Sequence, residues 1–184
     1  MTACEAAAPV FTQYVRGSEL SAALRDELAV CWATVANAGG AVIPADCPLP
    51  PLTSRDTAPA VDRVADALAP GHCRVLTATR DGALAGWLLV RRESHPLEAH
   101  CGVVNHVQTQ VALRGMGIGL ALMHHARDLA REMGLERLKL TVRAGLGVER
   151  FYRKAGWAEV GRWPGALRVA PGDDRDDILM SLAL

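Results

Sequence analysis

Apolar and polar positions follow their clearest pattern between residues 110 and 140. An apolar strand ends there in a glycine-rich turn. Apolar residues then recur three and four positions apart from Leu122 to Met133, which predicts a helix with one buried face. Gly134 fits a left-handed cap at the end of that helix, and residues 137–142 have the apolar character of a buried strand. The predicted order is strand, glycine turn, helix, strand.

The rest of the chain alternates between strand-like and helix-like segments. Strands are predicted at 10–15, 74–79, 84–91, 100–111, 157–162 and 178–184, and helices after Ser18, after Thr57 and over about 148–155. Asp81-Gly82 is a tight-turn signal, whereas residues 41–56, 93–99 and 164–177 are predicted loops. Helices between sheet segments predict an α/β or α+β fold with a central mixed sheet, in one domain over residues 1–184.

Composition restricts the class of protein. The formal charge of the 184 residues is zero, so the chain lacks the electrostatic footprint of a protein that binds nucleic acid or an anionic membrane. Its five cysteines are odd in number and form no CxxC pair, which favours reduced thiols in a cytosol. The N-terminus lacks the pattern of a signal peptide, and no apolar run reaches the length of a membrane span. We therefore expect a soluble, cytoplasmic protein.

The turn at residues 114–119, Arg-Gly-Met-Gly-Ile-Gly, has the composition of a phosphate-binding loop. A helix start carries unpaired N–H groups and a partial positive charge, and glycine lacks the Cβ that would keep a pyrophosphate away from them. Arg114 adds a full positive charge. A tight turn that binds nothing explains the glycines equally well. A dinucleotide fingerprint fits poorly, because position 120 is leucine and the strand at 137–142 has no carboxylate for a ribose.

Two motifs at a defined separation resemble those of the GCN5-related N-acetyltransferases (GNAT). Arg114-x-x-Gly117-x-Gly119 resembles the family's acetyl-CoA pyrophosphate signature, and the segment at 151–157 resembles its later helix and strand. The likeness covers residues 74–162 well, and the first seventy residues only by the order of elements. Three further segments are similar to the tabtoxin-resistance type: Ala144-Gly145-x-x-x-Glu149 before Phe151-Tyr152, Gly161-x-x-Pro164-Gly165, and Gly39-Gly40-Ala41.

The resemblance implies a GNAT-like fold, in which helices flank a central mixed, mostly antiparallel sheet. It also implies that the strand at 100–111 splays from the strand at 137–142. The pantetheine arm of acetyl-CoA would lie between them and pair with the backbone of Val107 and Thr109, so that the side chains there matter little. The residues expected to bind acetyl-CoA are Val107, Gln108, Thr109, Arg114, Gly115, Met116, Gly117, Ile118 and Gly119.

Tyr152 is the predicted catalytic residue. It aligns with the tyrosine that serves as general acid in much of the family, and a phenol with a pKa near 10 can protonate a thiolate leaving group. The alternative is a tyrosine that only packs on the sheet. Gly145 departs from the asparagine that many relatives carry before this tyrosine, and Thr141 stands where the tabtoxin-resistance type has an aspartate.

The general base is left open by the sequence. The strand at 100–111 has no carboxylate, because Val103 and Asn105 occupy the positions where relatives often place glutamate. The base could be His100 or His106, or water ordered by Asn105 and Gln108, and a purely structural role for His106 is an equal alternative. Trp32, Asn105 and His106 are the expected acceptor-site residues, with core filling as the alternative for Trp32. Residues 41–56 are interpreted as a lid over the acceptor.

Other clusters of polar residues favour a structural interpretation. His72-Cys73 and His100-Cys101 cannot chelate as pairs, since adjacent strand residues face opposite sides, and no metal is expected. The aspartates at 173, 174, 176 and 177 lack the pattern of a calcium loop and are predicted to form a solvated turn, with attraction of a cationic acceptor as the lesser alternative.

The leading interpretation is an acetyl-CoA-dependent N-acetyltransferase. It would act on a small-molecule amine by direct attack in a ternary complex, and the narrower expectation is an amino-acid-like antibiotic or toxin, with a role in antibiotic resistance. Two alternatives stay open: a non-catalytic acyl-CoA-binding or sensor module, and a protein or peptide N-acetyltransferase. Either a monomer or a homodimer is compatible with the sequence, and no nucleic-acid or membrane partner is expected.

Overall fold

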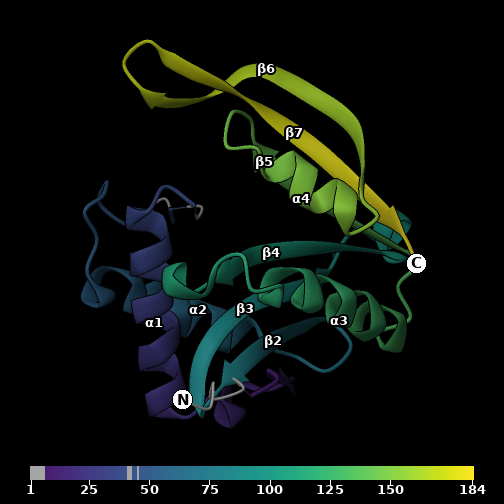
Figure 1. The fold of residues 1–184 in the computed structure, drawn as a ribbon. Helices are drawn as coiled ribbons and strands as arrows, with labels where there is room; N and C mark the ends of the chain where they lie inside the picture. Colours follow the sequence, from purple (N-terminus) through teal and green to yellow (C-terminus); the bar gives the residue numbers. More distant parts are fainter. Residues whose placement is uncertain (1–6, 41–42, 45) are drawn as a thin grey trace, which may run out of the picture.

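A computed structural model describes residues 7–40, 43–44 and 46–184. They form a seven-stranded sheet in the order β1-β2-β3-β4-β5-β7-β6, flanked by helices (Figure 1). The strands are β1 (Val10–Tyr14), β2 (Cys73–Arg80), β3 (Ala83–Arg92), β4 (Cys101–Thr109), β5 (Arg137–Arg143), β6 (Ala158–Ala170) and β7 (Asp173–Ala183). The helices are α1 (Ala22–Asn37), α2 (Ser54–Ala67), α3 (Ile118–Glu132) and α4 (Val148–Lys154). The predicted fold class is confirmed.

The strand pairing is antiparallel except at the centre of the sheet. β4 and β5 pair in parallel, and α3 makes the crossover between them. Every other neighbouring pair in the sheet is antiparallel. The Asp81-Gly82 turn joins β2 to β3 with positive φ at both residues, 52° and 80°, as the tight-turn signal predicts. The sheet is therefore mixed and mostly antiparallel, as expected.

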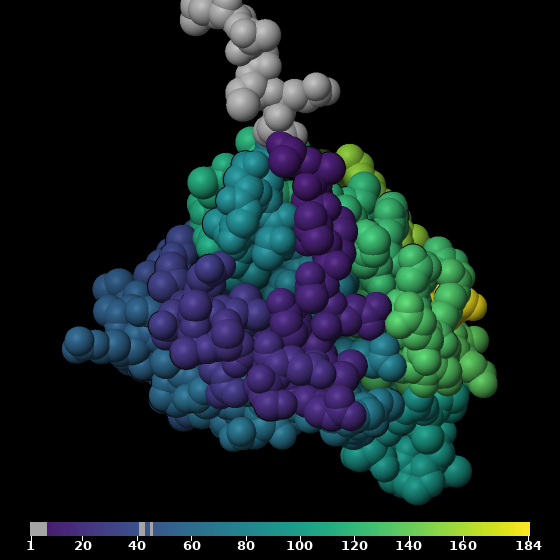
Figure 2. Space-filling model, turned by 90° about the horizontal axis from the view of Figure 1, so that it is seen from below, coloured from purple at the N-terminus to yellow at the C-terminus, as the bar shows by residue number. Residues whose placement is uncertain are grey.

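Two apolar cores lie on opposite faces of the sheet. One joins α1 and α2 to β2 and β3 and includes the buried side chains of Trp32, Val61 and Trp87. The other joins α3 and α4 to the sheet and includes Leu122, Leu129 and Tyr152. Figure 2 shows β1 at the edge of the sheet, between the side covered by α1 and the side covered by α3. The two cores hold the central strands fixed from both sides.

Helix α3 forms where the apolar periodicity predicts it. Leu122, Ala126, Leu129 and Ala130 are fully buried on one face, and Gly134 follows with a φ of 69°. Burial of this face fixes the start of the helix, at Ile118, directly after the glycine-rich turn.

Both N-terminal helices begin at residues other than those predicted. Ser21 rather than Ser18 caps α1, because its side chain accepts a hydrogen bond from the Leu24 N–H at 3.2 Å. Helix α2 begins at Ser54 rather than after Thr57, with a capping box in which Asp56 accepts from the Thr53 N–H at 2.7 Å. Apolar spacing detects the buried face of a helix, whereas capping groups set its first residue.

The predicted loop at 164–177 is wrong. β6 and β7 run through it as a long hairpin that turns at Pro171-Gly172, where Gly172 has a φ of 79° (Figure 1). Pro164 and Gly165 fit in β6 because β6 is an edge strand and its pairing with β7 is irregular between Trp163 and Leu167. β4 is shorter than predicted and ends at Thr109, because residues 111–113 form a short 3-10 turn.

Candidate active site

The parallel strands β4 and β5 pair over three residues and then part. Their register runs from Cys101 with Arg137 to Val103 with Lys139, although β4 continues to Thr109 and β5 to Arg143. The backbone groups of β4 that would face β5 beyond Val103 are therefore available to an extended ligand, in the manner of an added strand. This separation of two adjacent strands is the arrangement that the resemblance implies.

A bulge lies in β4 where the strands part. Leu89 of β3 is opposite Asn105, whereas Trp87 is opposite Gln108, so β4 holds an extra residue between them. His106, within the bulge, has a φ of 54°, a conformation that non-glycine residues adopt rarely and that occurs often at functional sites. The bulge re-aims the side chains of β4 at the point where β4 leaves β5.

His106 packs against two tryptophans on the α1 side of the sheet. Its ring centroid is 4.4 Å from that of Trp32 and 5.4 Å from that of Trp87. Burial lowers the pKa of His106 to about 4, so the imidazole is neutral near pH 7 and is a weak proton acceptor. Trp32 is 2% exposed and belongs to the core, yet it also contacts His106. The structure thus brings together two of the three predicted acceptor-site residues.

Gln108 follows His106 by two residues in β4 and is 2% exposed. The Trp87 indole N–H donates to its Oε1 at 3.1 Å, and Gln108 Nε2 has no hydrogen-bond partner in the described part of the chain. Gln108 thus has a structural contact in the core, and the expectation that side chains on this stretch matter little for cofactor binding stays a prediction. Trp87 had no predicted role, although an aromatic residue one position after Gly86 in a strand was a signal that could have drawn attention to it.

The glycine-rich turn is open where the predicted ligand would lie. Gly115 and Gly117 have φ values of 82° and 81°, and a Cβ added at either position would meet nothing within 4 Å. Because the N-cap residue of α3 is Gly117, no side chain caps this helix start, and its N–H groups can bind a phosphate. The turn fits the pyrophosphate of acetyl-CoA. Met116 is 57% exposed on the same turn, and Ile118 is buried below it.

Gly119 and Arg114 make structural contacts in addition to the phosphate-binding role that the sequence predicts for them. A Cβ at Gly119 would lie 3.3 Å from Thr109 Oγ1 and 3.4 Å from Phe151, so this glycine allows α3 to pack closely on β4 and α4. Arg114 is exposed, and its Nη2 lies 2.7 Å from the position of a Cβ on Gly40, which places the guanidinium at the C-terminal end of α1. In this structure Arg114 therefore lies over the end of α1.

Tyr152 projects from α4 into the core on the α3 side. It is 9% exposed, and its ring lies edge-on to Phe151 and Trp157 with centroids 5.0 Å and 6.2 Å away. Burial raises the pKa of Tyr152 to about 12, so the phenol keeps its proton throughout the physiological range. A protonated phenol is the state that a general acid requires.

The far end of β5 contacts the segment after α1. Arg143, the last residue of β5, donates to the Gly39 carbonyl at 2.6 Å. Asn37, the last residue of α1, donates to the Leu52 carbonyl at 2.9 Å and accepts from the Leu52 N–H at 2.7 Å. The predicted lid at 41–56 is thereby anchored near both of its ends; residues 41, 42 and 45 of it, and Ala41 of the Gly39-Gly40-Ala41 motif, lie outside the described residues.

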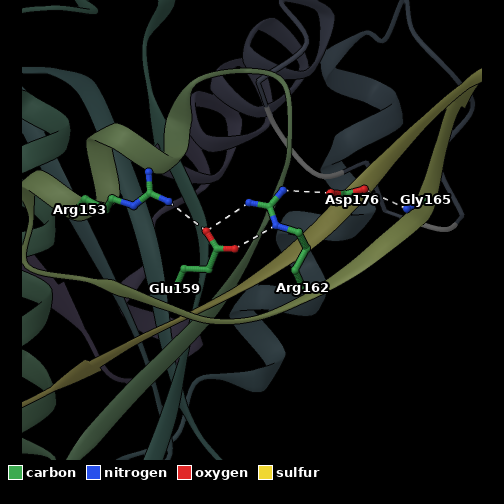
Figure 3. Close-up of polar contacts among 5 residues, drawn as sticks. All are labelled: Arg153, Glu159, Arg162, Gly165 and Asp176. Atoms are coloured by element: carbon green, nitrogen blue, oxygen red, sulfur yellow. Dashed lines mark hydrogen bonds and ion pairs between the residues drawn. The ribbon is translucent and has the colours of Figure 1, made fainter.

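The hairpin of β6 and β7 is tied to α4 by ion pairs. Arg153 of α4 and Arg162 of β6 both bind Glu159, and Arg162 also binds Asp176, which accepts from the Gly165 N–H (Figure 3). The Arg162 and Arg153 guanidinium groups hold the pKa of Glu159 below its usual value. The prediction of a solvated turn here is wrong, since the aspartates lie in β7. Asp173 and Asp174 pair with Arg175 and Arg168, which weakens the idea that they attract a cationic acceptor.

Comparison with known proteins assigns the family. The model of the acetyltransferase (GNAT) family matches residues 44–157, which is more than half of the chain. The chain belongs to this family; it is an N-acetyltransferase, and acetyl-CoA is the acetyl donor of such enzymes. No curated protein sequence matches it significantly.

Solved structures show the same fold at low sequence identity. The aminoglycoside 6′-N-acetyltransferase complexed with coenzyme A is 15% identical, with a TM-score of 0.70 over 95% of this chain and 96% of that chain. The ribosomal-protein-alanine N-acetyltransferase from Brucella melitensis is 20% identical, with a TM-score of 0.69 over 95% and 99%. Nourseothricin acetyltransferase is 27% identical, with a TM-score of 0.53 over 60% and 65%. Their acceptors differ, so the fold alone does not define the acceptor of this chain.

Within the described residues, no group of three or more metal-ligating side chains could hold a metal ion. None of the described helices is long and apolar enough to cross a membrane.

Proposed function

We propose that the chain acetylates the amine of a small molecule by direct attack in a ternary complex, with Tyr152 as the proton donor. The observation that carries this proposal is the separation of β4 from β5 beside the open turn at Gly115 and Gly117. The turn would bind the pyrophosphate, and the β4 backbone at Val107 and Thr109 would pair with the pantetheine arm. Acetyl-CoA supplies the thioester carbonyl that the amine attacks, and CoA departs as the thiol.

The roles proposed for the side chains follow from their burial and charge. Tyr152 is protonated near pH 7 and would give its proton to the departing sulfur. His106 has a pKa of about 4, which favours removal of the amine proton by water ordered at Asn105 over direct transfer to the imidazole. Trp32 and His106 would form an apolar wall for the acceptor.

The acceptor class rests on two supports. The segments that resemble the tabtoxin-resistance type favour an amino-acid-like amine, and the solved relatives named for aminoglycosides and nourseothricin have antibiotic acceptors. Resistance to such a compound is the corresponding cellular role, and the cytoplasm is the corresponding location, supported by the free thiols of Cys31, Cys47, Cys73 and Cys101. The relative named for a ribosomal-protein alanine keeps a peptide acceptor as the second candidate.

The test begins with calorimetric titration of acetyl-CoA into the wild-type protein and Arg114→Ala. Micromolar binding that weakens in Arg114→Ala would support the assignment of the turn, and it would justify a screen of thiol release over amino-acid-like antibiotics, aminoglycosides and N-terminal alanine peptides. Release only with peptides would replace the small-molecule proposal. Binding without release on any amine would favour a non-catalytic acyl-CoA-binding module. A folded wild-type protein that does not bind acetyl-CoA would contradict the assignment of the turn as the acetyl-CoA site, and with it the proposed function.

A further inference from the structure

Arg80 lies at the end of β2 on the face of the sheet that α3 covers. Leu76 and Ala78, two and four positions earlier on the same strand, are buried in the core under α3. Because alternate residues of a strand share a face, Arg80 continues that row at the point where β2 turns into β3. The row thus ends in a cation beside the start of α3.

The side chain of Arg80 reaches the glycine-rich turn. Its Nη1 lies 3.1 Å from the Sδ of Met116, which is between Gly115 and Gly117. The Arg80 side chain is 17% exposed, and its nearest carboxylate in the described chain is that of Asp81, with Nε and Oδ2 separated by 3.9 Å and the Asp81 side chain 70% exposed. A thioether is a weak acceptor, so this largely buried side chain has guanidinium donors without a strong partner in the described residues.

Arg74, on the same face of β2, is paired at the other end of α3 through its Nη1, although its buried Nε has no hydrogen-bond partner in the described residues. Its Nη1 lies 3.3 Å from the carboxylate of Glu132 at the C-terminal end of α3, and 3.0 Å from Gln13 Oε1. The C-terminal end of a helix attracts cations, whereas the N-terminal end repels them. Arg80 lies at the end that repels a cation. A guanidinium and unpaired helix N–H groups of the same sign converge there, and an anion would stabilise both.

We propose that Arg80 binds a phosphate group of coenzyme A, so that the phosphate site extends from the turn at 115–117 onto the β2–β3 hairpin. The chemistry is a charge-assisted hydrogen bond between a planar guanidinium and phosphate oxygens. Coenzyme A carries two candidate groups, the pyrophosphate next to the pantetheine arm and the 3′-phosphate on the ribose. Either would neutralise Arg80, and the two are separable by experiment.

The experiment is calorimetric titration of three probes, coenzyme A, 3′-dephospho-coenzyme A and pantetheine, into wild-type protein, Arg80→Gln and Arg80→Lys. We expect Arg80→Gln to weaken coenzyme A binding about tenfold and to leave pantetheine binding unchanged. Arg80→Lys keeps the charge and should recover part of the loss. If the 3′-phosphate is the partner, 3′-dephospho-coenzyme A should bind wild type and Arg80→Gln equally. If the pyrophosphate is the partner, Arg80→Gln should bind 3′-dephospho-coenzyme A more weakly than wild type does, by the same factor as for coenzyme A.

Arg131→Gln is the matched control, because Arg131 is in the last turn of α3, where it pairs with Asp128 at 3.4 Å. It should bind all three probes as wild type does. Coenzyme A binding that is unchanged in Arg80→Gln, or that falls in parallel with pantetheine binding, would overturn the role of Arg80. The proposal rests on coenzyme A binding at the turn. Wild-type protein that binds neither nucleotide would refute that assignment, whereas wild-type binding with an unchanged Arg80→Gln refutes only Arg80.

Discussion

The indole N–H of Trp87 donates to the carboxamide oxygen of Gln108 at 3.1 Å, between two side chains that are 0% and 2% exposed. Because an indole N–H can only donate, this bond fixes which end of the Gln108 carboxamide faces Trp87. It also fixes the strand that carries His106, two residues earlier in β4. The bond therefore connects the core of β3 to the proposed acceptor wall.

Gln108→Leu should lower the free energy of unfolding by about 1 kcal/mol, because the buried Trp87 N–H loses its acceptor. Trp87→Phe removes the donor instead. The double variant should be less destabilised than the two single effects would give together, since neither partner is then left unpaired. Urea unfolding of the four proteins measures this coupling. Strictly additive losses would show that the hydrogen bond adds nothing to stability.

Protonation of His106 should destabilise the protein in mild acid. Its pKa is about 4 when folded, against about 6.5 in an unfolded chain, so the unfolded state binds a proton first as the pH falls. The neutral imidazole therefore contributes its full stabilisation above about pH 6.5. This contribution to the free energy of unfolding, about 3 kcal/mol in total, is lost as the pH falls to 4. Urea unfolding at pH 7 and pH 5 measures the loss.

The substituted proteins separate His106 from other groups that titrate in acid. His106→Asn should flatten the dependence of stability on pH between 7 and 5, and asparagine tolerates the positive φ of this position. His124→Asn, at an exposed site on α3, should keep the wild-type slope. Equal slopes in wild type and His106→Asn would mean that His106 is not the group responsible.

Elements with strong local signals could be predicted from the sequence. The apolar face of α3, the cap at Gly134 and the Asp81-Gly82 turn each depend on neighbours within a few residues, and all three are present. β6 could not be predicted beyond its first residues, because Pro164 and Gly165 resemble a loop locally and are accommodated only by the sheet edge and by Asp176 of the partner strand. Tertiary pairing overrides local preference there.

Some features of the candidate site could likewise be predicted from the sequence, and others could not. The open turn at Gly115 and Gly117 follows from a motif, since positive φ and a missing Cβ are properties of single residues. The bulge at His106 and the proximity of Arg80 to Met116 depend on register between strands that are far apart in sequence. Side-chain chemistry alone could not indicate either. Tyr152 as proton donor stays a prediction that mutation must test.

Tyr152→Phe should lower turnover at least tenfold and leave the affinity for acetyl-CoA nearly unchanged, because it removes a proton donor and keeps the buried ring. Thiol release and calorimetry on the same sample measure the two quantities. Tyr14→Phe is the matched control, since Tyr14 lies in β1 against the other core and should turn over as wild type does. Full activity in Tyr152→Phe would leave Tyr152 with a packing role only.

Glycine at position 145 departs from the asparagine that the family resemblance leads us to expect there. Its φ is 87°, and a Cβ added to it would overlap Nη1 of Arg175, which is held by Asp173. Gly145→Asn should therefore lower the free energy of unfolding by about 1–3 kcal/mol. Gly147→Asn is the control. Its φ is 69°, and the nearest atom to a Cβ added there is Nη2 of Arg150, 3.8 Å away. This variant should lose less free energy of unfolding than Gly145→Asn.

The overlap with Arg175 can be removed separately from the backbone strain. In the double variant Gly145→Asn/Arg175→Ala, the shortened side chain at 175 leaves room for the Cβ at 145. Part of the lost stability should therefore return. Arg175→Ala alone should not stabilise the protein. Thermal unfolding of the four proteins compares them. If Gly145→Asn and Gly147→Asn are destabilised equally and Arg175→Ala restores nothing, backbone strain alone explains the glycine. If Gly145→Asn is as stable as wild type, Arg175 moves freely, and the departure from the family's asparagine has no structural cause at this site.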